Sequence, residues 1–187
     1  MYNFNEESVL DIKEVNMQYT SSEAAKLLRT LNDEEQALLS KEHLSSTFVA
    51  AIEEDVESVR PAYSYSETQQ KLAEIREKVR RVKHAINCFN VTQQVPELGM
   101  TIDQVLVYIP QLSAQKAKLD SMRNRLPKQR DEAGGYYSRN KTIVEYTYAN
   151  YDIAAAEKDY NEVSARLAKA QTALDVVNNT VKFEIDI

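Results

Sequence analysis

The sequence contains little glycine, proline or cysteine and no tryptophan. Its 187 residues include three glycines and four prolines, which argues against an all-β or loop-rich protein. The single cysteine, Cys88, excludes an internal disulfide bond. Because a domain of this length buries roughly 70% of the surface that its unfolded chain exposes, its core needs no disulfide or metal to be stable. We expect one helical domain over residues 1–187, in which residues 1–20 form a flexible lead-in.

Long apolar runs and an excess of positive charge are also missing. No stretch approaches the roughly 18 consecutive apolar residues of a transmembrane helix, and residues 1–15 lack the basic start and apolar run of a secretory signal. The net charge of -6 opposes general attraction to nucleic acid and to anionic membranes. We therefore expect a cytoplasmic protein without a transmembrane segment.

The residues of common catalytic and metal sites are scarce. Neither histidine, His43 or His84, is expected to have a second histidine or a cysteine at ligand spacing. Glu35 and Glu42 share one face of a predicted helix, but di-metal bundles also need Glu-x-x-His pairs, which the sequence lacks. We expect these glutamates to flank a helix seam or to pair with Lys116. Since phosphate-binding loops, dinucleotide motifs and nucleophile elbows are absent too, the sequence predicts no enzyme, metal site or cofactor.

Four long amphipathic helices are predicted from capping signals and from apolar residues spaced by three and four positions. The helices are expected at about 21–43, 66–90, 102–126 and 153–177, and their starts are marked by Thr20 with Glu23, Ser66 with Gln69, Thr101 with Gln104, and Asp152. The second helix has the most regular apolar series, whereas the first has a partly polar seam at Glu35 and Glu42. Pro110 lies inside the third helix and predicts a kink there.

Two segments beside the fourth helix alternate apolar and polar residues as strands do, namely 142–148 and 181–187. The segment 47–52 is a third candidate for a short strand. Because a lone strand needs a partner for its edge, the first two can pair with each other, with the segment around Phe48, or with another subunit. The expected fold is therefore mainly α, with four long helices in a bundle or coiled-coil-like hairpin arrangement and two or three short strands.

A set of short motifs lies between about residues 72 and 184. It comprises KHAINCFNVT, GMTIDQVLVYIPQL, a strand with IVEYTY, the helix start Asp152-Ile153 and the exit Asn178-Asn179. Together these motifs resemble the septicolysin-like family of small helical bacterial proteins. This chain differs in having a longer N-terminal section and no tryptophan after the last asparagine. The resemblance implies a helical fold and a tendency to associate, and it implies no active-site residues.

Two groups of residues are candidate binding surfaces. Tyrosines gather around Gly134-Gly135, and tyrosine favours interfaces because it supplies a large contact area at low entropic cost. The candidate interface residues are Tyr136, Tyr137, Tyr146, Tyr148, Tyr151 and Phe183. The candidate polyanion contacts at the basic end of the third helix are Lys116, Lys118, Arg123, Arg125, Lys128 and Arg130. The alternatives are that the tyrosines cover the chain's own helices and that the basic residues form a solvated face.

The biochemical role is not specified by any of these features. The leading hypothesis is a non-enzymatic, self-associating helical protein that forms a homo-oligomer and acts through protein–protein interaction. The first alternative is a nucleic-acid-associated regulatory factor that uses the basic helix ends, although the net charge disfavours it. The second alternative is a membrane-acting, cytolysin-like protein, as the family name suggests.

Overall fold

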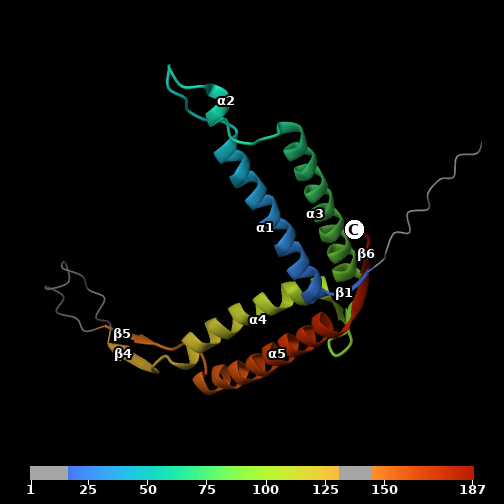
Figure 1. Cartoon of the computed structure of the whole chain (residues 1–187). Coiled ribbons are helices and arrows are strands. Elements are labelled where there is room, and N and C mark those ends of the chain that lie inside the picture. The colour runs from blue at the N-terminus through green and yellow to red at the C-terminus, as the bar shows by residue number, and fades with distance from the viewer. Residues whose placement is uncertain (1–16, 131–144) are drawn as a thin grey trace, which may run out of the picture. The chain divides into compact units, whose positions relative to one another are not determined.

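The computed structural model describes residues 17–130 and 145–187, which are mainly helical (Figure 1). The helices are α1 (Ser21–Ser45), α2 (Val56–Val59), α3 (Tyr65–Thr92), α4 (Ile102–Arg123) and α5 (Ile153–Thr180). The strands are β1 (Met17–Thr20), β2 (Gln94–Val95), β3 (Met100–Thr101), β4 (Lys128–Arg130), β5 (Tyr146–Tyr148) and β6 (Lys182–Ile185). The predicted class, mainly α with short strands appended, is confirmed.

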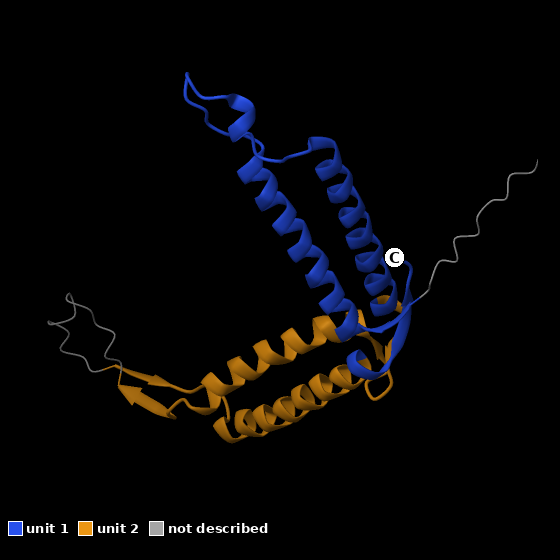
Figure 2. Cartoon of the chain, viewed as in Figure 1, with its two compact units in different colours: residues 1–90, 178–187 blue, residues 91–177 orange. Residues whose placement is uncertain are grey.

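The chain divides into two compact units (Figure 2). Unit 1 consists of residues 1–90 and 178–187, and unit 2 consists of residues 91–177. Unit 1 is therefore built from two separate parts of the chain. That the two units unfold together as one domain stays a prediction.

Unit 1 is an antiparallel hairpin of α1 and α3, closed at one end by a two-stranded sheet (Figure 1). Its core joins Ala24 and Leu31 of α1 to Val82 of α3 and Ile185 of β6, all of which are buried. These residues come from the apolar series of each helix and from the alternating tail. The hydrophobic effect thus ties the C-terminal strand to the helical hairpin.

The sheet of unit 1 pairs β1 with β6 in antiparallel register, with Met17 opposite Ile185 and Thr20 opposite Lys182. The strand predicted in the tail is confirmed, but its partner within the chain is neither of the two predicted segments, and pairing with another subunit stays a prediction. The partner comes from the residues expected to form a flexible lead-in. Met17–Thr20 is too short to show a clear alternating pattern of its own. It is a strand because it pairs with Lys182–Ile185, which lies far away in the sequence.

Unit 2 contains the antiparallel pair α4 and α5 (Figure 1). Its core consists of Leu112 and Leu119 from α4 and Val163, Leu167 and Ala170 from α5. A tight turn between β2 and β3 leads into α4, and Gly99 adopts a φ of 62° there, which L-residues with a side chain rarely adopt. α4 continues through Pro110 without a break in its helical assignment.

Three of the four predicted helix starts are confirmed. At α1, the N–H of Glu23 donates to Thr20 Oγ1 at 3.2 Å and the N–H of Thr20 donates to Glu23 Oε2 at 2.8 Å. The N–H of Thr101 donates to Gln104 Oε1 at 3.0 Å before α4, and Asp152 Oδ1 accepts from a backbone N–H of α5 at 2.9 Å. Side chains therefore satisfy N–H groups that a helix start leaves without partners.

One predicted helix start is wrong. α3 begins at Tyr65, so Ser66 lies inside the helix, and it is Ser64 Oγ that accepts from the Glu67 N–H at 3.5 Å. The segment 47–52, only a candidate for a short strand, instead belongs to the connection between α1 and α3, which also contains the single-turn helix α2. The apolar residues in 47–52 made a strand possible. The helix α2 that follows has four residues and is capped by Asp55.

Candidate interaction surfaces

The end of unit 2 brings together residues of both predicted binding groups. β4 pairs with β5 in antiparallel register, so Lys128 lies opposite Tyr148 and Arg130 lies opposite Tyr146. Lys128 and Arg130, the last two of the predicted basic residues, and the tyrosines of the following strand thus belong to one antiparallel strand pair. We call Arg125, Leu126, Lys128, Arg130, Tyr146 and Tyr148 the basic tyrosine tip.

Cation–π contacts organise this tip. Lys128 Nζ lies 4.1 Å from the ring centroid of Tyr146 and 5.4 Å from that of Tyr148, and the two ring centroids are 6.5 Å apart. Such contacts contribute about 0.5–1 kcal/mol at exposed sites. Tyr146 is nevertheless 45% exposed and Tyr148 60% exposed. The tip therefore presents aromatic surface to solvent beside the ammonium group of Lys128.

A second cation–π group lies between α4 and α5. The Arg123 guanidinium carbon is 3.8 Å from the ring centroid of Tyr160, and Lys116 Nζ is 5.5 Å from it. Arg123 also forms an ion pair with Asp120 at 2.8 Å. In the sequence Tyr160 falls in the three-four series of apolar residues of the fourth predicted helix, which indicates a core position and not a platform for two cations. Lys116 could have indicated this contact, because it stands between Leu112 and Leu119 at a position of the three-four series that is otherwise apolar.

The other predicted interface residues have different positions. The hydroxyl of Tyr151 donates to the Met122 carbonyl at 2.9 Å, so this half-buried tyrosine caps the end of α4. Phe183 belongs to unit 1, where its ring stacks on Phe89 with centroids 4.3 Å apart. Tyr136 and Tyr137 lie outside the described residues. Of the remaining predicted polyanion contacts, Lys118 is an exposed residue of α4.

The glutamates of the α1 seam find partners within unit 1. The Glu35 carboxylate accepts from Arg76 Nε at 2.7 Å, across the two helices of the hairpin. The Glu42 carboxylate likewise accepts hydrogen bonds from side chains of unit 1, those of Tyr63 and Gln69. Of the two alternatives for these glutamates, the structure gives the polar seam between the helices of unit 1.

Glu42 Oε1 accepts two hydrogen bonds, from the Tyr63 hydroxyl at 2.7 Å and from Gln69 Nε2 at 2.8 Å. The hydrogen bond to Glu42 raises the pKa of Tyr63 to about 12, because losing the proton would place a phenolate beside a carboxylate. Gln69 was expected to cap its own helix and instead joins the two helices. These hydrogen bonds join α1 to Tyr63 and to α3, so we interpret them as contacts that stabilise unit 1 and not as an acid–base pair.

One pair of potential ligands was missed. His84 and Cys88 lie four residues apart on α3, and Cys88 Sγ is 3.5 Å from His84 Nε2. The expectation that neither histidine has a cysteine at ligand spacing is wrong for His84, because one helical turn brings positions i and i+4 together. Among the described residues, however, no three His, Cys, Asp or Glu side chains are placed to hold a metal ion.

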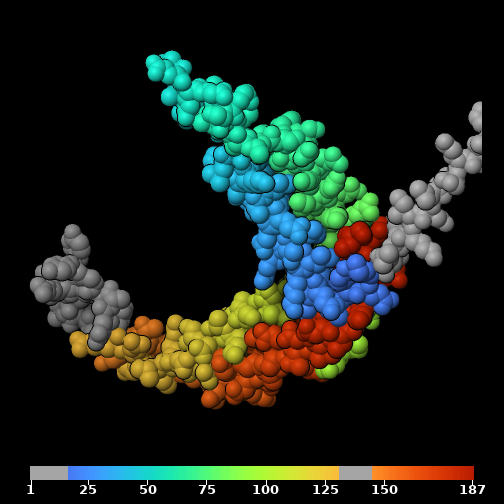
Figure 3. Space-filling view, viewed as in Figure 1, coloured from blue at the N-terminus to red at the C-terminus, as the bar shows by residue number. Residues whose placement is uncertain are grey.

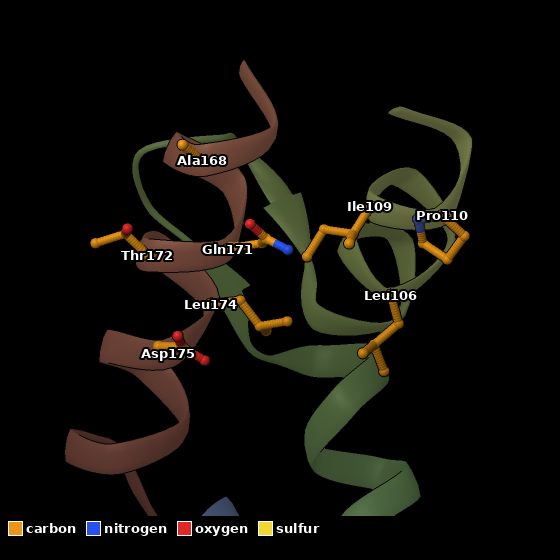
Figure 4. Close-up of a pocket in the computed structure, with 8 residues that line it drawn as sticks. All are labelled: Leu106, Ile109, Pro110, Ala168, Gln171, Thr172, Leu174 and Asp175. Atoms are coloured by element: carbon orange, nitrogen blue, oxygen red, sulfur yellow. The ribbon is translucent and has the colours of Figure 1, made fainter. Parts of the chain in front are cut away.

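An open groove of about 620 Å³ lies between α4 and α5 (Figure 4). Its lining consists of Leu106, Ile109, Pro110, Ala168, Gln171, Thr172, Leu174 and Asp175. Because Pro110 has no N–H, the Leu106 carbonyl at the groove lacks its usual helical donor. The lining contains one carboxylate and no histidine, cysteine, lysine or arginine, so it offers binding surface and no pair of groups for general acid–base catalysis.

The comparisons with known proteins bear on the fold alone. No family model matches the chain, and no curated protein matches its sequence. A similar solved structure is the crystal structure of a functionally unknown conserved protein from Corynebacterium diphtheriae, with 15% sequence identity and a TM-score of 0.54. The match covers 89% of this chain and 99% of that chain. The fold thus occurs in another protein, and the resemblance to the septicolysin-like family stays a prediction.

None of the helices in the described part of the chain combines the length and the apolar character needed to span a membrane.

Proposed function

We propose that this chain is a non-enzymatic protein that associates with copies of itself and acts through protein–protein contacts made by the basic tyrosine tip. The observation that carries the proposal is the strand pair β4–β5, which holds two exposed tyrosines over a lysine. Tyrosine and arginine are enriched where interfaces gain most of their binding energy. A surface that is already ordered also loses less entropy when it binds.

The two-stranded sheet supports the same proposal. β4 and β5 pair only with each other among the described residues, so each strand has an outer edge with N–H and C=O groups available to another chain. An added strand on such an edge is a common mode of protein recognition. The tip therefore offers both side-chain and main-chain contacts to a partner.

Light scattering on a sizing column tests the proposal. We expect the wild-type chain to elute above its monomer mass of 21.4 kDa, and the double variant Tyr146→Ser/Tyr148→Ser to elute at that mass. Tyr146→Phe/Tyr148→Phe keeps the rings and should retain the assembly. The control Val91→Ser/Val107→Ser removes exposed apolar side chains of unit 2 outside the tip and should retain it too. A wild-type chain at monomer mass at all concentrations would contradict the proposal.

A second candidate function is binding of single-stranded nucleic acid by the same tip. Aromatic rings beside lysine and arginine form the kind of platform on which bases stack while the cations contact phosphates. Fluorescence anisotropy with a labelled 20-nucleotide strand tests this alternative. Binding that weakens steeply with salt and is lost in Tyr146→Ser/Tyr148→Ser would support it, and the absence of binding at low salt would exclude it.

The membrane-acting alternative has a separate test. Release of dye from anionic vesicles by the wild-type chain would support it, and vesicles that stay intact would remove it.

A further inference from the structure

Unit 1 carries an exposed apolar surface where its two helices are connected. Residues 46–60, which we call the acidic apolar loop, project from the end of the α1–α3 hairpin (Figure 3). Val49 is 93% exposed and Ile52 is fully exposed, and Phe48 and Val56 are exposed as well. Single exposed apolar residues are ordinary, but several within one short segment mark a surface that binds something.

Contacts within the acidic apolar loop hold it in shape. Arg60 stacks over the Phe48 ring at 5.3 Å and binds both carboxylate oxygens of Glu57, at 2.7 and 2.9 Å. The N–H of Ala51 donates to Glu54 Oε2 at 3.1 Å, and the Glu54 N–H donates to the Ala51 carbonyl at 3.1 Å. Polar contacts thus fix the backbone from which Val49 and Ile52 extend into solvent.

The charge of the acidic apolar loop is opposite to that of the basic tyrosine tip. The loop contains four acidic residues and one basic residue, and its basic residue is already bound to Glu57. Residues 123–130, which include the first part of the tip, contain four basic residues and no acidic residue, and of these Arg123 is bound to Asp120. Opposite charge across an interface speeds association and selects the correct partner. Each surface also combines its charges with exposed apolar or aromatic groups.

We propose that the acidic apolar loop of one copy of the chain docks on the basic tyrosine tip of a second copy, an inference that rests on the proposed function. Val49 and Ile52 lie against the rings of Tyr146 and Tyr148, while the carboxylates of the loop face the lysine and arginines of the tip. The two surfaces differ, so the interface is heterologous. Copies joined in this way close into a ring or extend as a filament.

Charge also decides between this partner and an anionic membrane. A loop with four acidic residues is repelled by anionic lipid headgroups, whereas a basic protein surface attracts it. The occupant must therefore supply positive charge and apolar or aromatic surface together, and the basic tyrosine tip supplies both.

Complementation between two variants of the full chain tests the inference. Val49→Ser/Ile52→Ser disables the loop and keeps the tip, and Tyr146→Ser/Tyr148→Ser disables the tip and keeps the loop. By light scattering, each variant alone should have the monomer mass of 21.4 kDa. An equimolar mixture should have twice that mass, because one intact loop and one intact tip remain and the complex cannot grow further. Raising the salt concentration should weaken this dimer.

The control is Val107→Ser, which removes a valine that is 60% exposed on α4 and should leave the wild-type assembly unchanged. An assembly that is lost in the tip variant but retained in the loop variant would overturn this inference and leave the proposed function standing. A mixture that stays at monomer mass would also overturn it. A wild-type chain that is itself monomeric would overturn both.

Discussion

Replacing Ile185 by alanine tests whether the C-terminal strand belongs to the core of unit 1. Ile185 is 0% exposed and packs with Ala24, Leu31 and Val82, which come from both helices of the hairpin. The substitution removes three carbon groups from this core, and at about 0.8 kcal/mol for each buried group the transfer term is about 2.4 kcal/mol. The cavity left behind adds to this loss.

The expected total for Ile185→Ala is about 3 kcal/mol, in the lower half of the range of about 2–5 kcal/mol for such substitutions. We choose the lower half because β6 is paired on one side, by β1, and can shift to fill part of the cavity. Urea unfolding followed by far-UV circular dichroism measures the change in the free energy of unfolding. Glu184→Ala is the matched control, because this neighbour on β6 is exposed and should change the stability by less than about 0.5 kcal/mol.

A loss smaller than about 1 kcal/mol in Ile185→Ala would refute the reasoning, since it would mean that the isoleucine is not buried in a packed core. The same titration tests the single-domain prediction. One cooperative transition, seen equally by circular dichroism and by tyrosine fluorescence, would support a single domain. Two transitions, with only one shifted by Ile185→Ala, would show that the two units unfold separately.

Three further predictions concern single contacts. Thr20→Ala removes the hydroxyl that caps α1 and should cost about 1 kcal/mol in urea unfolding, whereas Thr20→Ser should cost less. Tyr63→Phe tests the hydrogen bond from the Tyr63 hydroxyl to Glu42. The pKa of Tyr63 rises from 10.0 to about 12 on folding. The hydrogen bond therefore contributes fully to the stability of the folded state below pH 10, and this contribution is lost as the pH rises toward 12. The difference in melting temperature between wild type and Tyr63→Phe should shrink over that interval, and a constant difference would contradict the assignment. Tyr160→Leu removes the cation–π contacts of α4 and should cost about 0.5–1 kcal/mol by urea unfolding, while a neutral result would mean that Arg123 gains nothing from the ring.

The helices were predictable because their signals are local. Thr20 with Glu23 and Thr101 with Gln104 each place a cap beside the helix that it starts, and apolar residues at three-four spacing define the buried face. Ser66 misled the prediction because Gln69, three residues later, completes the pattern of a capping box. In the structure the helix begins one residue earlier, at Tyr65, so Ser66 is not its cap. The side chain of Gln69 donates to the charged carboxylate of Glu42 on α1 instead of to the backbone at the start of its own helix.

The strand pairs were not predictable in the same way. Lys128–Arg130 has the sequence KQR, which carries no strand pattern, and it becomes a strand because Tyr146–Tyr148 pairs with it. For this reason the basic residues and the tyrosines were predicted as two separate surfaces. A β-pair depends on residues far apart in the sequence, so periodicity within one segment does not reveal its partner.

The pairing of β1 with β6 sets an unusual order for folding during synthesis. Ile185 completes the core of unit 1, yet the whole of unit 2 lies between the two parts of unit 1 in the chain. At typical ribosomal rates the roughly 90 residues in between take on the order of ten seconds to make. The helical hairpin is therefore made well before β6, and its apolar end stays uncovered until the C-terminal strand is synthesised. A chaperone that acts on this nascent chain would find its binding site there, and release would come with the arrival of β6.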